Sequence, residues 1–197
     1  MRVAILDYGT GNLHSLAKAL ERSGAQVSIE TDPVTALSSD ALILPGVGAF
    51  AEAAAGLAPC VASLREALIG GLPCLGICLG MQLLFEGSDE GAGAGIGLIP
   101  GHVRRLRARR VPHMGWNAVQ AGSDPIFAGI EREHLYFANS FAAEPAERSG
   151  VVAWTDYDGD AFPAAVRHGR TWGVQFHPEK SGAAGLRLLE NFLGEVA

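Results

Sequence analysis

The sequence has little that would suit a membrane or a nucleic acid. No window of its 197 residues approaches the roughly 20 apolar residues that a membrane-spanning helix needs. Its formal net charge of -6 argues against a general role on nucleic acids or anionic membranes, which select basic surfaces. Hydrophobic residues make up 48 % of the chain, which predicts a single α/β domain over residues 1–197 with a continuous core.

Cysteine is also scarce. Cys60, Cys74 and Cys78 are an odd number without the spacing of a disulfide framework, which favours a reducing compartment. The first residues lack the length and cleavage site of a signal peptide, so we expect a cytoplasmic protein. Paired C-x-x-C or H-E-x-x-H spacings and a G-x-x-x-x-G-K-[ST] motif are missing, so no metal and no other cofactor is expected.

The first half of the sequence alternates short apolar stretches with helical patterns. Strands are predicted at 2–7, 26–30, 40–45 and 73–77, and helical stretches at 12–24 and 50–69. Such an alternation implies right-handed crossovers and a mostly parallel sheet.

The second half changes character after a glycine-rich loop at 89–101. Strand candidates follow closely at 102–107, 115–120, 134–141, 151–155, 162–168 and 171–176, before a final helix at 182–197. Hairpins are expected here, so the predicted fold class is α/β, with an open mixed sheet that is mostly parallel and has antiparallel strands in its second half. The basic run "VRRLRARR" at 103–110 is interpreted as a solvated hairpin, with a phosphate-binding or partner-facing patch as the alternative.

The stretch "GICLG" at 76–80 places Cys78 where a strand ends and a helix begins. In an open parallel sheet, ligands bind at the carboxyl ends of the strands, and a tight strand-to-helix turn pushes its central residue outward there. The start of the following helix favours the thiolate form. The pattern indicates a nucleophile, with a small apolar residue filling a turn as the alternative. Cys74, inside a predicted strand, and Cys60, beside a proline, are interpreted as packing residues.

A cysteine nucleophile needs a general base, and the base needs a group that orients it. The stretch "FHPE" at 176–179 supplies His177 and Glu179 directly after a predicted strand. Two residues apart, both side chains can lean toward the same face, and Pro178 stiffens the turn between them. We therefore expect Glu179 to hold the imidazole of His177 while His177 faces Cys78. A lone histidine would more often be structural.

Four motifs extend this pattern: "LDYGTGNLHSL" at 6–16, "PGVGAF" at 45–50, "VPHMGWN" at 111–117 and "HPEKSGAAGLRLLENF" at 177–192. With the cysteine turn they resemble the class I, triad-type glutamine amidotransferases over nearly the whole chain. Within that family they are most similar to the glutaminase subunits of imidazole glycerol phosphate synthases, of histidine biosynthesis. The resemblance implies a flavodoxin-like sheet with helices on both faces. It also implies hydrolysis of L-glutamine to glutamate and ammonia through a thioester on Cys78.

The reaction requires backbone donors that converge on the oxyanion of the tetrahedral intermediate. The amide of Leu79 is one candidate. By resemblance, the turn at 45–48 supplies the other through the amide of Val47 once a peptide there reorients, which Gly46 and Gly48 make easy. Because this turn and Cys78 both follow parallel strands, they are expected at the same rim of the sheet. The alternative is a plain tight turn.

Residues for glutamine binding follow from the resemblance. Gln82, one helical turn beyond Cys78, is implied as a contact for the backbone groups of glutamine, and Glu90 as a partner of its ammonium group. Ser140 and Phe141 are implied to line the pocket through backbone groups. The neighbouring sequence departs from the family pattern at three positions, with Ala138, Asn139 and Phe141 where Val, His and Tyr are frequent.

The resemblance also implies a partner. In this family the glutaminase docks as a heterodimer on a cyclase with a (β/α)8 barrel, which receives the ammonia. The family positions that form the interface or take part in signalling correspond here to Asn12, Trp116, Tyr136 and Lys180. Trp116 is expected to anchor the interface, with an ordinary buried tryptophan as the alternative. Glutamine turnover is expected to stay low until the cyclase binds its own substrate.

Three alternatives share parts of the pattern. A glutaminase subunit of anthranilate or aminodeoxychorismate synthase would share the cysteine turn and the late histidine, but "DYGTGN" and "PHMGWN" favour the histidine branch. A stand-alone cysteine hydrolase on a flavodoxin-like fold would act rapidly without a partner. A non-catalytic regulatory binding subunit would keep the fold and lose the chemistry, which the intact Cys78, His177 and Glu179 argue against.

Overall fold

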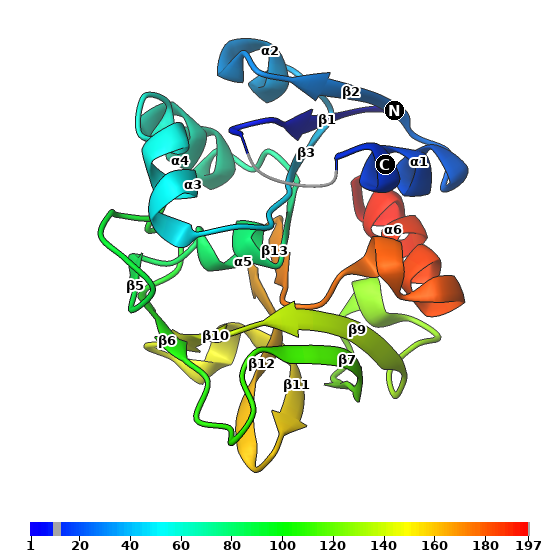
Figure 1. The fold of residues 1–197 in the computed structure, drawn as a ribbon. Helices are drawn as coiled ribbons and strands as arrows, with labels where there is room; N and C mark the ends of the chain where they lie inside the picture. Colours follow the sequence, from blue (N-terminus) through cyan, green and yellow to red (C-terminus); the bar gives the residue numbers. More distant parts are fainter. Residues whose placement is uncertain (10–12, 197) are drawn as a thin grey trace.

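An eight-stranded mixed sheet forms the centre of the protein in the computed structural model, which describes residues 1–9 and 13–196 (Figure 1). Its strands are β1 (Arg2–Leu6), β2 (Gln26–Glu30), β3 (Ala41–Leu44), β4 (Cys74–Ile77), β8 (Gln120–Ala121), β11 (Val151–Tyr157), β12 (Asp160–His168) and β13 (Thr171–Val174). The spatial order is β2-β1-β3-β4-β13-β12-β11-β8. The first five strands pair in parallel and the remaining pairs are antiparallel, so the predicted mixed sheet is confirmed.

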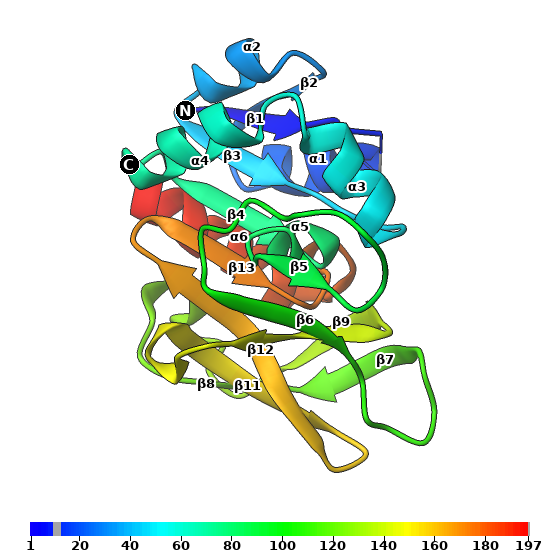
Figure 2. The same cartoon turned by 90° about the vertical axis from the view of Figure 1, so that its left-hand side faces the viewer.

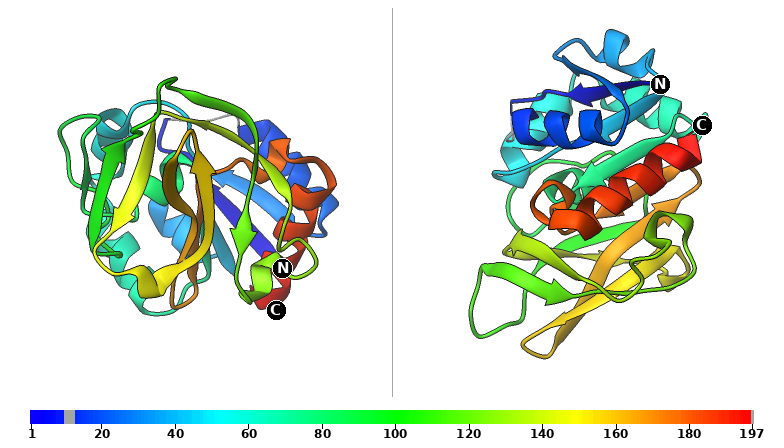
Figure 3. Two further views of the ribbon diagram at one scale, coloured as in Figure 1. Left: turned by 90° about the horizontal axis from the view of Figure 1, so that it is seen from below. Right: turned by 90° about the vertical axis from the view of Figure 1, so that its right-hand side faces the viewer.

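Helices cover both faces of this sheet (Figures 1 and 2). Helices α1 (Leu13–Arg22) and α6 (Gly182–Val196) pack on one face, where Figure 3 shows them side by side, and α3 (Phe50–Leu57) and α4 (Val61–Ile69) pack on the other. The strands supply both cores by alternation: Val3 and Ile5 join the α1 and α6 core, while Ala4 and Leu6 join the other. Within the described ranges, no helix combines the length and apolar character needed to cross a membrane.

The second half adds two small sheets, which lie against β11 and β12 at the antiparallel end of the main one (Figure 1). One contains β5 (Gly87–Ser88), β6 (Gly101–Arg105) and β10 (Phe141–Pro145), and the other contains β7 (His113–Ala118) and β9 (His134–Asn139). The strand predicted at 134–141 is thus two strands, because β9 and β10 pair in different sheets on either side of Ser140. The expected hairpins are confirmed as β11 with β12 and β12 with β13.

One helix prediction needs correction, and one helix was not predicted. The stretch 50–69 is not one helix but α3 and α4, separated at 58–60, where Pro59 has no amide hydrogen to continue the helical hydrogen bonds. The short helix α2 (Pro33–Leu37) was missed although Asp32 caps it, accepting the amides of Val34 and Thr35 at 3.3 and 3.1 Å. The helix after Cys78, α5 (Leu79–Gln82), has only four residues.

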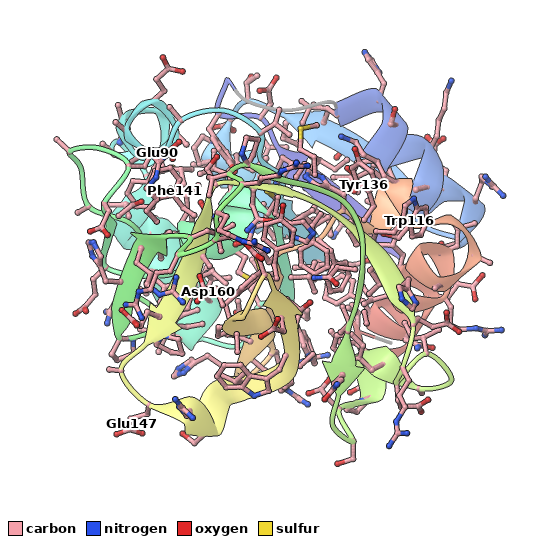
Figure 4. All side chains as sticks on the ribbon, turned by 60° about the horizontal axis from the view of Figure 1, so that its bottom comes forward. Glu90, Trp116, Tyr136, Phe141, Glu147 and Asp160 are labelled. Atoms are coloured by element: carbon pink, nitrogen blue, oxygen red, sulfur yellow. The ribbon has the colours of Figure 1, made fainter. Side chains whose placement is uncertain are left out.

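The basic run at 103–110 is not a hairpin, because β6 ends at Arg105 and the next strand, β7, pairs in another sheet. Arg104 is buried and holds Asp160, labelled in Figure 4, with two hydrogen bonds of 2.8 and 2.7 Å. Burial alone would raise the pKa of Asp160, but its hydrogen bonds to Arg104 and to the amide of Arg107 lower it. Arg104 therefore links β6 to β12 of the main sheet.

Candidate active site

The cysteine after β4 occupies a strained backbone conformation. Cys78 has φ 53° and ψ -107°, a region that residues with a Cβ rarely adopt. Close packing maintains it: a Cβ at Gly80 would collide with the carbonyl of Leu44, and a Cβ at Gly76 would lie 2.7 Å from the carbonyl oxygen of Gly80. Strain of this kind is retained where the surrounding structure holds it, and it is concentrated at functional sites.

His177 and Glu179 lie next to Cys78, after the parallel strand β13. Nδ1 of His177 is 2.8 Å from Oε1 of Glu179, and their side chains are 2 % and 7 % exposed. Burial alone would lower the pKa of His177, but interactions with the Cys78 sulfur and the Glu179 carboxylate raise it to about 9. Nε2 of His177 is buried and has no hydrogen-bond partner of normal geometry among the described residues. It is therefore the nitrogen left to exchange a proton with the sulfur or a substrate.

The turn after β3 lies directly against the cysteine turn. The amide of Leu79 donates a hydrogen bond of 3.4 Å to the carbonyl of Gly46, and a Cβ at Gly46 would be 2.9 Å from the amide nitrogen of Gly80. The carbonyl of Gly46 and the amide of Val47 belong to one planar peptide, so the Val47 N–H points away from Leu79. Gly48 has φ +118°, which a glycine adopts readily. One predicted oxyanion donor is thus occupied, and the other is turned away.

A cavity of about 150 Å³ opens beside Cys78, and Glu90 and Phe141, labelled in Figure 4, lie on its walls. Its lining contains the four residues predicted to bind substrate, and consists of Val47, Gly48, Cys78, Leu79, Gln82, Glu90, Ala138, Asn139, Ser140 and Phe141. Glu90 is fixed by the amide of Phe50, which donates to its Oε2 at 2.8 Å. A larger surface hollow of about 570 Å³, around Arg109 and Tyr157, contains no candidate nucleophile, so the smaller cavity is the candidate site.

Two buried polar residues at the site were not predicted. Gln175 is fully buried, and its Nε2 donates to the Cys78 sulfur at 3.5 Å. Asn139 donates from Nδ2 to the carbonyl of Phe141 at 3.0 Å, and its buried Oδ1 has no partner within the described ranges. Gln175 stands two residues before His177 at the same strand end, and this spacing of two was the signal available in the sequence.

Three of the four predicted interface residues lie among those described, on β7, β9 and the turn that follows His177. Trp116 is 55 % exposed, which contradicts the alternative of a buried tryptophan, and it meets Tyr136 edge-on with ring centroids 6.1 Å apart (Figure 4). Nζ of Lys180 lies 6.0 Å from the Tyr136 ring centroid. Asn12 lies outside the described residues. Among those described, no group of three or more His, Cys, Asp or Glu residues is placed to hold a metal ion.

Comparison with known proteins supplies the family. The family described as Glutamine amidotransferase class-I matches residues 4–196. The chain therefore belongs to the class-I glutamine amidotransferases and is an enzyme of that class, as its motifs predicted.

Among curated proteins, the chain is similar to imidazole glycerol phosphate synthase subunit HisH from several organisms. It is 44 % identical to the subunit of Synechococcus sp. (strain JA-3-3Ab), covering 100 % of this chain and 95 % of that protein. Identity to the Corynebacterium diphtheriae subunit is 44 %, covering 98 % of each chain. Identity to the Halobacterium salinarum subunit is 45 %, covering 99 % of this chain and 94 % of the other.

Solved structures show the same fold at low sequence identity. PurLQS from Thermotoga maritima superposes with a TM-score of 0.79 at 21 % identity, covering 100 % of this chain and 99 % of the other. The glutaminase domain of Trypanosoma brucei CTPS with bound acivicin gives 0.71 at 18 %, covering 100 % and 93 %. These two likenesses confirm the fold.

Proposed function

We propose that this chain is the glutaminase subunit of an imidazole glycerol phosphate synthase. It hydrolyses L-glutamine and passes ammonia to a cyclase subunit, which forms imidazole glycerol phosphate and AICAR in histidine biosynthesis. The observation that carries the proposal is the strained Cys78 beside the buried pair of His177 and Glu179, in a chain similar to HisH over its whole length.

Acylation starts from an ion pair. Because the pKa of His177 is about 9, its imidazolium form predominates at neutral pH and supports a thiolate on Cys78. The thiolate attacks the side-chain amide carbon of glutamine and forms a carbon–sulfur bond. His177 then gives its proton to the departing nitrogen, and ammonia leaves as the carbon–nitrogen bond breaks.

Deacylation uses the same residues in reverse. The neutral His177 takes a proton from water, and the resulting hydroxide attacks the thioester carbon. Glutamate leaves as the carbon–sulfur bond breaks, which restores the thiolate and the imidazolium. Glu179 holds Nδ1 throughout, so that Nε2 carries every proton transfer.

The polar groups of the cavity suit the amino-acid end of glutamine. Both hydrogens of Gln82 Nε2 are used inside the protein, on the carbonyl of Phe141 at 3.1 Å and on Oε1 of Gln175 at 3.0 Å. Gln82 therefore offers its Oε1, and Glu90 its carboxylate, to the ammonium group. The carbonyl of Phe141 already accepts two hydrogen bonds, from Gln82 and Asn139, so it is not assigned to substrate. The carbonyl of Ser140 accepts one, from the amide of Leu106, and keeps a second lone pair.

The turn at 45–48 would control the rate. Rotation of the peptide between Gly46 and Val47 would break its hydrogen bond to Leu79 and aim the Val47 amide at the oxyanion, alongside the released Leu79 amide. Until then the tetrahedral intermediate lacks both donors. This supports a low basal rate that rises when the cyclase holds its substrate.

The exposed face around Trp116 is proposed as the contact with the cyclase. Met114, on the same strand, is also exposed, and aromatic and methionine side chains are enriched at such interfaces. This face connects directly to the base, because the amide of His177 donates to the carbonyl of Tyr136 at 2.8 Å. A movement of β9 on docking would therefore reach the active site.

Reconstitution of the synthase tests the proposal. The chain is mixed with the cyclase, and imidazole glycerol phosphate is measured with either glutamine or ammonia as the nitrogen source. We expect both sources to serve with the wild type, and ammonia alone with Cys78→Ala. Glutamine-dependent synthesis by Cys78→Ala would contradict the proposal. Failure of the wild type with this cyclase, but success with a chorismate-using synthase, would favour the alternative branch.

A further inference from the structure

The buried side chain of Gln175 is held in one orientation. The carbonyl of Phe141 can only accept, so the Gln82 group that faces it at 3.1 Å must be the amide nitrogen. That nitrogen donates its second hydrogen to Gln175 at 3.0 Å, so the oxygen of Gln175 faces Gln82. The nitrogen of Gln175 must then face the sulfur of Cys78, 3.5 Å away. The carbonyl of Phe141 therefore fixes the donor direction of all three hydrogen bonds in this series.

We propose that Gln175 is a positioning residue that holds the sulfur of Cys78 as a thiolate through a hydrogen bond from its Nε2. The inference rests on the proposed nucleophilic role of Cys78. It names a residue outside the Cys78, His177 and Glu179 set and connects the nucleophile to the substrate-binding residue Gln82.

The groups around the Cys78 sulfur leave the stabilisation of its thiolate to a side chain. The helix after Cys78 has only four residues, so its dipole contributes little there. The carbonyl of Ala138 lies 4.0 Å from the sulfur, too far to hold a thiol hydrogen firmly. The charged groups nearby are the imidazolium of His177, the carboxylate of Glu179 that holds it and, across the cavity, the carboxylate of Glu90. Gln175 supplies a neutral donor that stays in place when His177 gives up its proton.

Alkylation by iodoacetamide measures the effect directly. The rate of labelling at Cys78 is followed by mass spectrometry at neutral pH for the wild type, Gln175→Glu and Gln175→Leu. Both variants remove the donor, so we expect labelling to slow about five- to tenfold, because a hydrogen bond to an ionised group is lost. Gln120→Glu makes the same charge change at an exposed position at the far edge of the sheet and should label at the wild-type rate.

The two variants also separate positioning from folding. Gln175→Glu keeps the size of the side chain and an oxygen for Gln82, so in the assembled synthase kcat should fall with little change in KM. Gln175→Leu also releases Gln82, so KM should rise as well. Cys74 is fully buried in β4, and its labelling would report loss of the fold. If the Leu variant unfolds, the Glu variant still decides the question.

Each outcome addresses a different claim. Equal labelling rates at Cys78 in the wild type and in folded Gln175→Glu would overturn the role of Gln175 and leave the nucleophile standing. A wild-type Cys78 that labels no faster than the partly exposed Cys60 would overturn the nucleophile itself, and with it the proposed function.

Discussion

The amide of Leu79 donates a hydrogen bond to the carbonyl of Gly46, with 3.4 Å between nitrogen and oxygen. The bond is long, and it joins the turn after β3 to the turn after β4. It occupies the donor that the reaction needs. The structure is therefore that of a resting enzyme in the proposed mechanism, and loss of this bond is the step that permits catalysis.

Removing the amide of residue 47 tests this step. In Val47→Pro the nitrogen has no hydrogen to donate after the peptide turns, so cyclase-activated glutamate release should fall roughly 100-fold or more. Val47 is 43 % exposed, so Val47→Ala is a matched control that keeps the amide and should retain activity. An equal loss in both variants, measured as kcat, would show that the side chain matters and the amide does not.

The charge on His177 makes stability depend on pH. Its pKa is raised on folding from 6.5 to about 9, so its contribution to stability is fully present below about pH 6.5 and is lost as the pH rises through about 9. Compared with His177→Gln, the wild type should lose unfolding free energy as the pH rises from about 6.5 to about 9. Urea unfolding at a series of pH values measures this, and parallel curves for the two proteins would contradict the charged pair.

The exposed tryptophan is predicted to serve binding rather than folding. Trp116→Ala should weaken association with the cyclase roughly tenfold or more, as expected for an aromatic anchor, and leave the melting temperature unchanged. Titration calorimetry and thermal unfolding provide the two readouts. Val34→Ala removes another exposed apolar side chain, on α2, and should bind the cyclase normally.

The basic run contains one structural arginine. Arg104→Ala leaves the buried Asp160 carboxylate without its cation, so unfolding free energy should drop on the order of 3 kcal/mol. Arg109 pairs with Asp158, but its side chain is 90 % exposed, so Arg109→Ala should unfold at the denaturant midpoint of the wild type. Equal midpoints for the two variants would indicate that the whole run at 103–110 is a solvated surface.

Local patterns in the sequence predicted much of the molecule. The parallel half of the sheet follows from apolar stretches separated by helices, and the grouping of Cys78, His177 and Glu179 follows from turns at two strand ends. The meeting of Cys78 with His177, which are far apart in the sequence, was predicted from the base that a cysteine nucleophile needs and from the family resemblance. The other parts of both predictions depend on residues only a few positions apart. Such patterns are fixed by backbone geometry, which the sequence specifies directly.

Features that depend on distant partners were not predictable in this way. Gln175 meets Cys78 across 97 positions and Gln82 across 93, and Arg104 meets Asp160 across 56. The split of 134–141 into β9 and β10 likewise depends on which strands pair with each part, and nothing in its own residues marks it. Burial and pairing decide these cases, and both come from the assembled fold.

Glutamate release from glutamine is the most direct test of a resting enzyme that its partner activates. The rate is measured for this chain alone, with the cyclase, and with the cyclase plus its own substrate, using Cys78→Ala as the blank. The account predicts slow release by the chain alone and a sharp rise with the substrate-loaded cyclase. A high rate for the chain alone that the loaded cyclase leaves unchanged would contradict it, because the hydrogen bond between Leu79 and Gly46 would then not restrain the reaction.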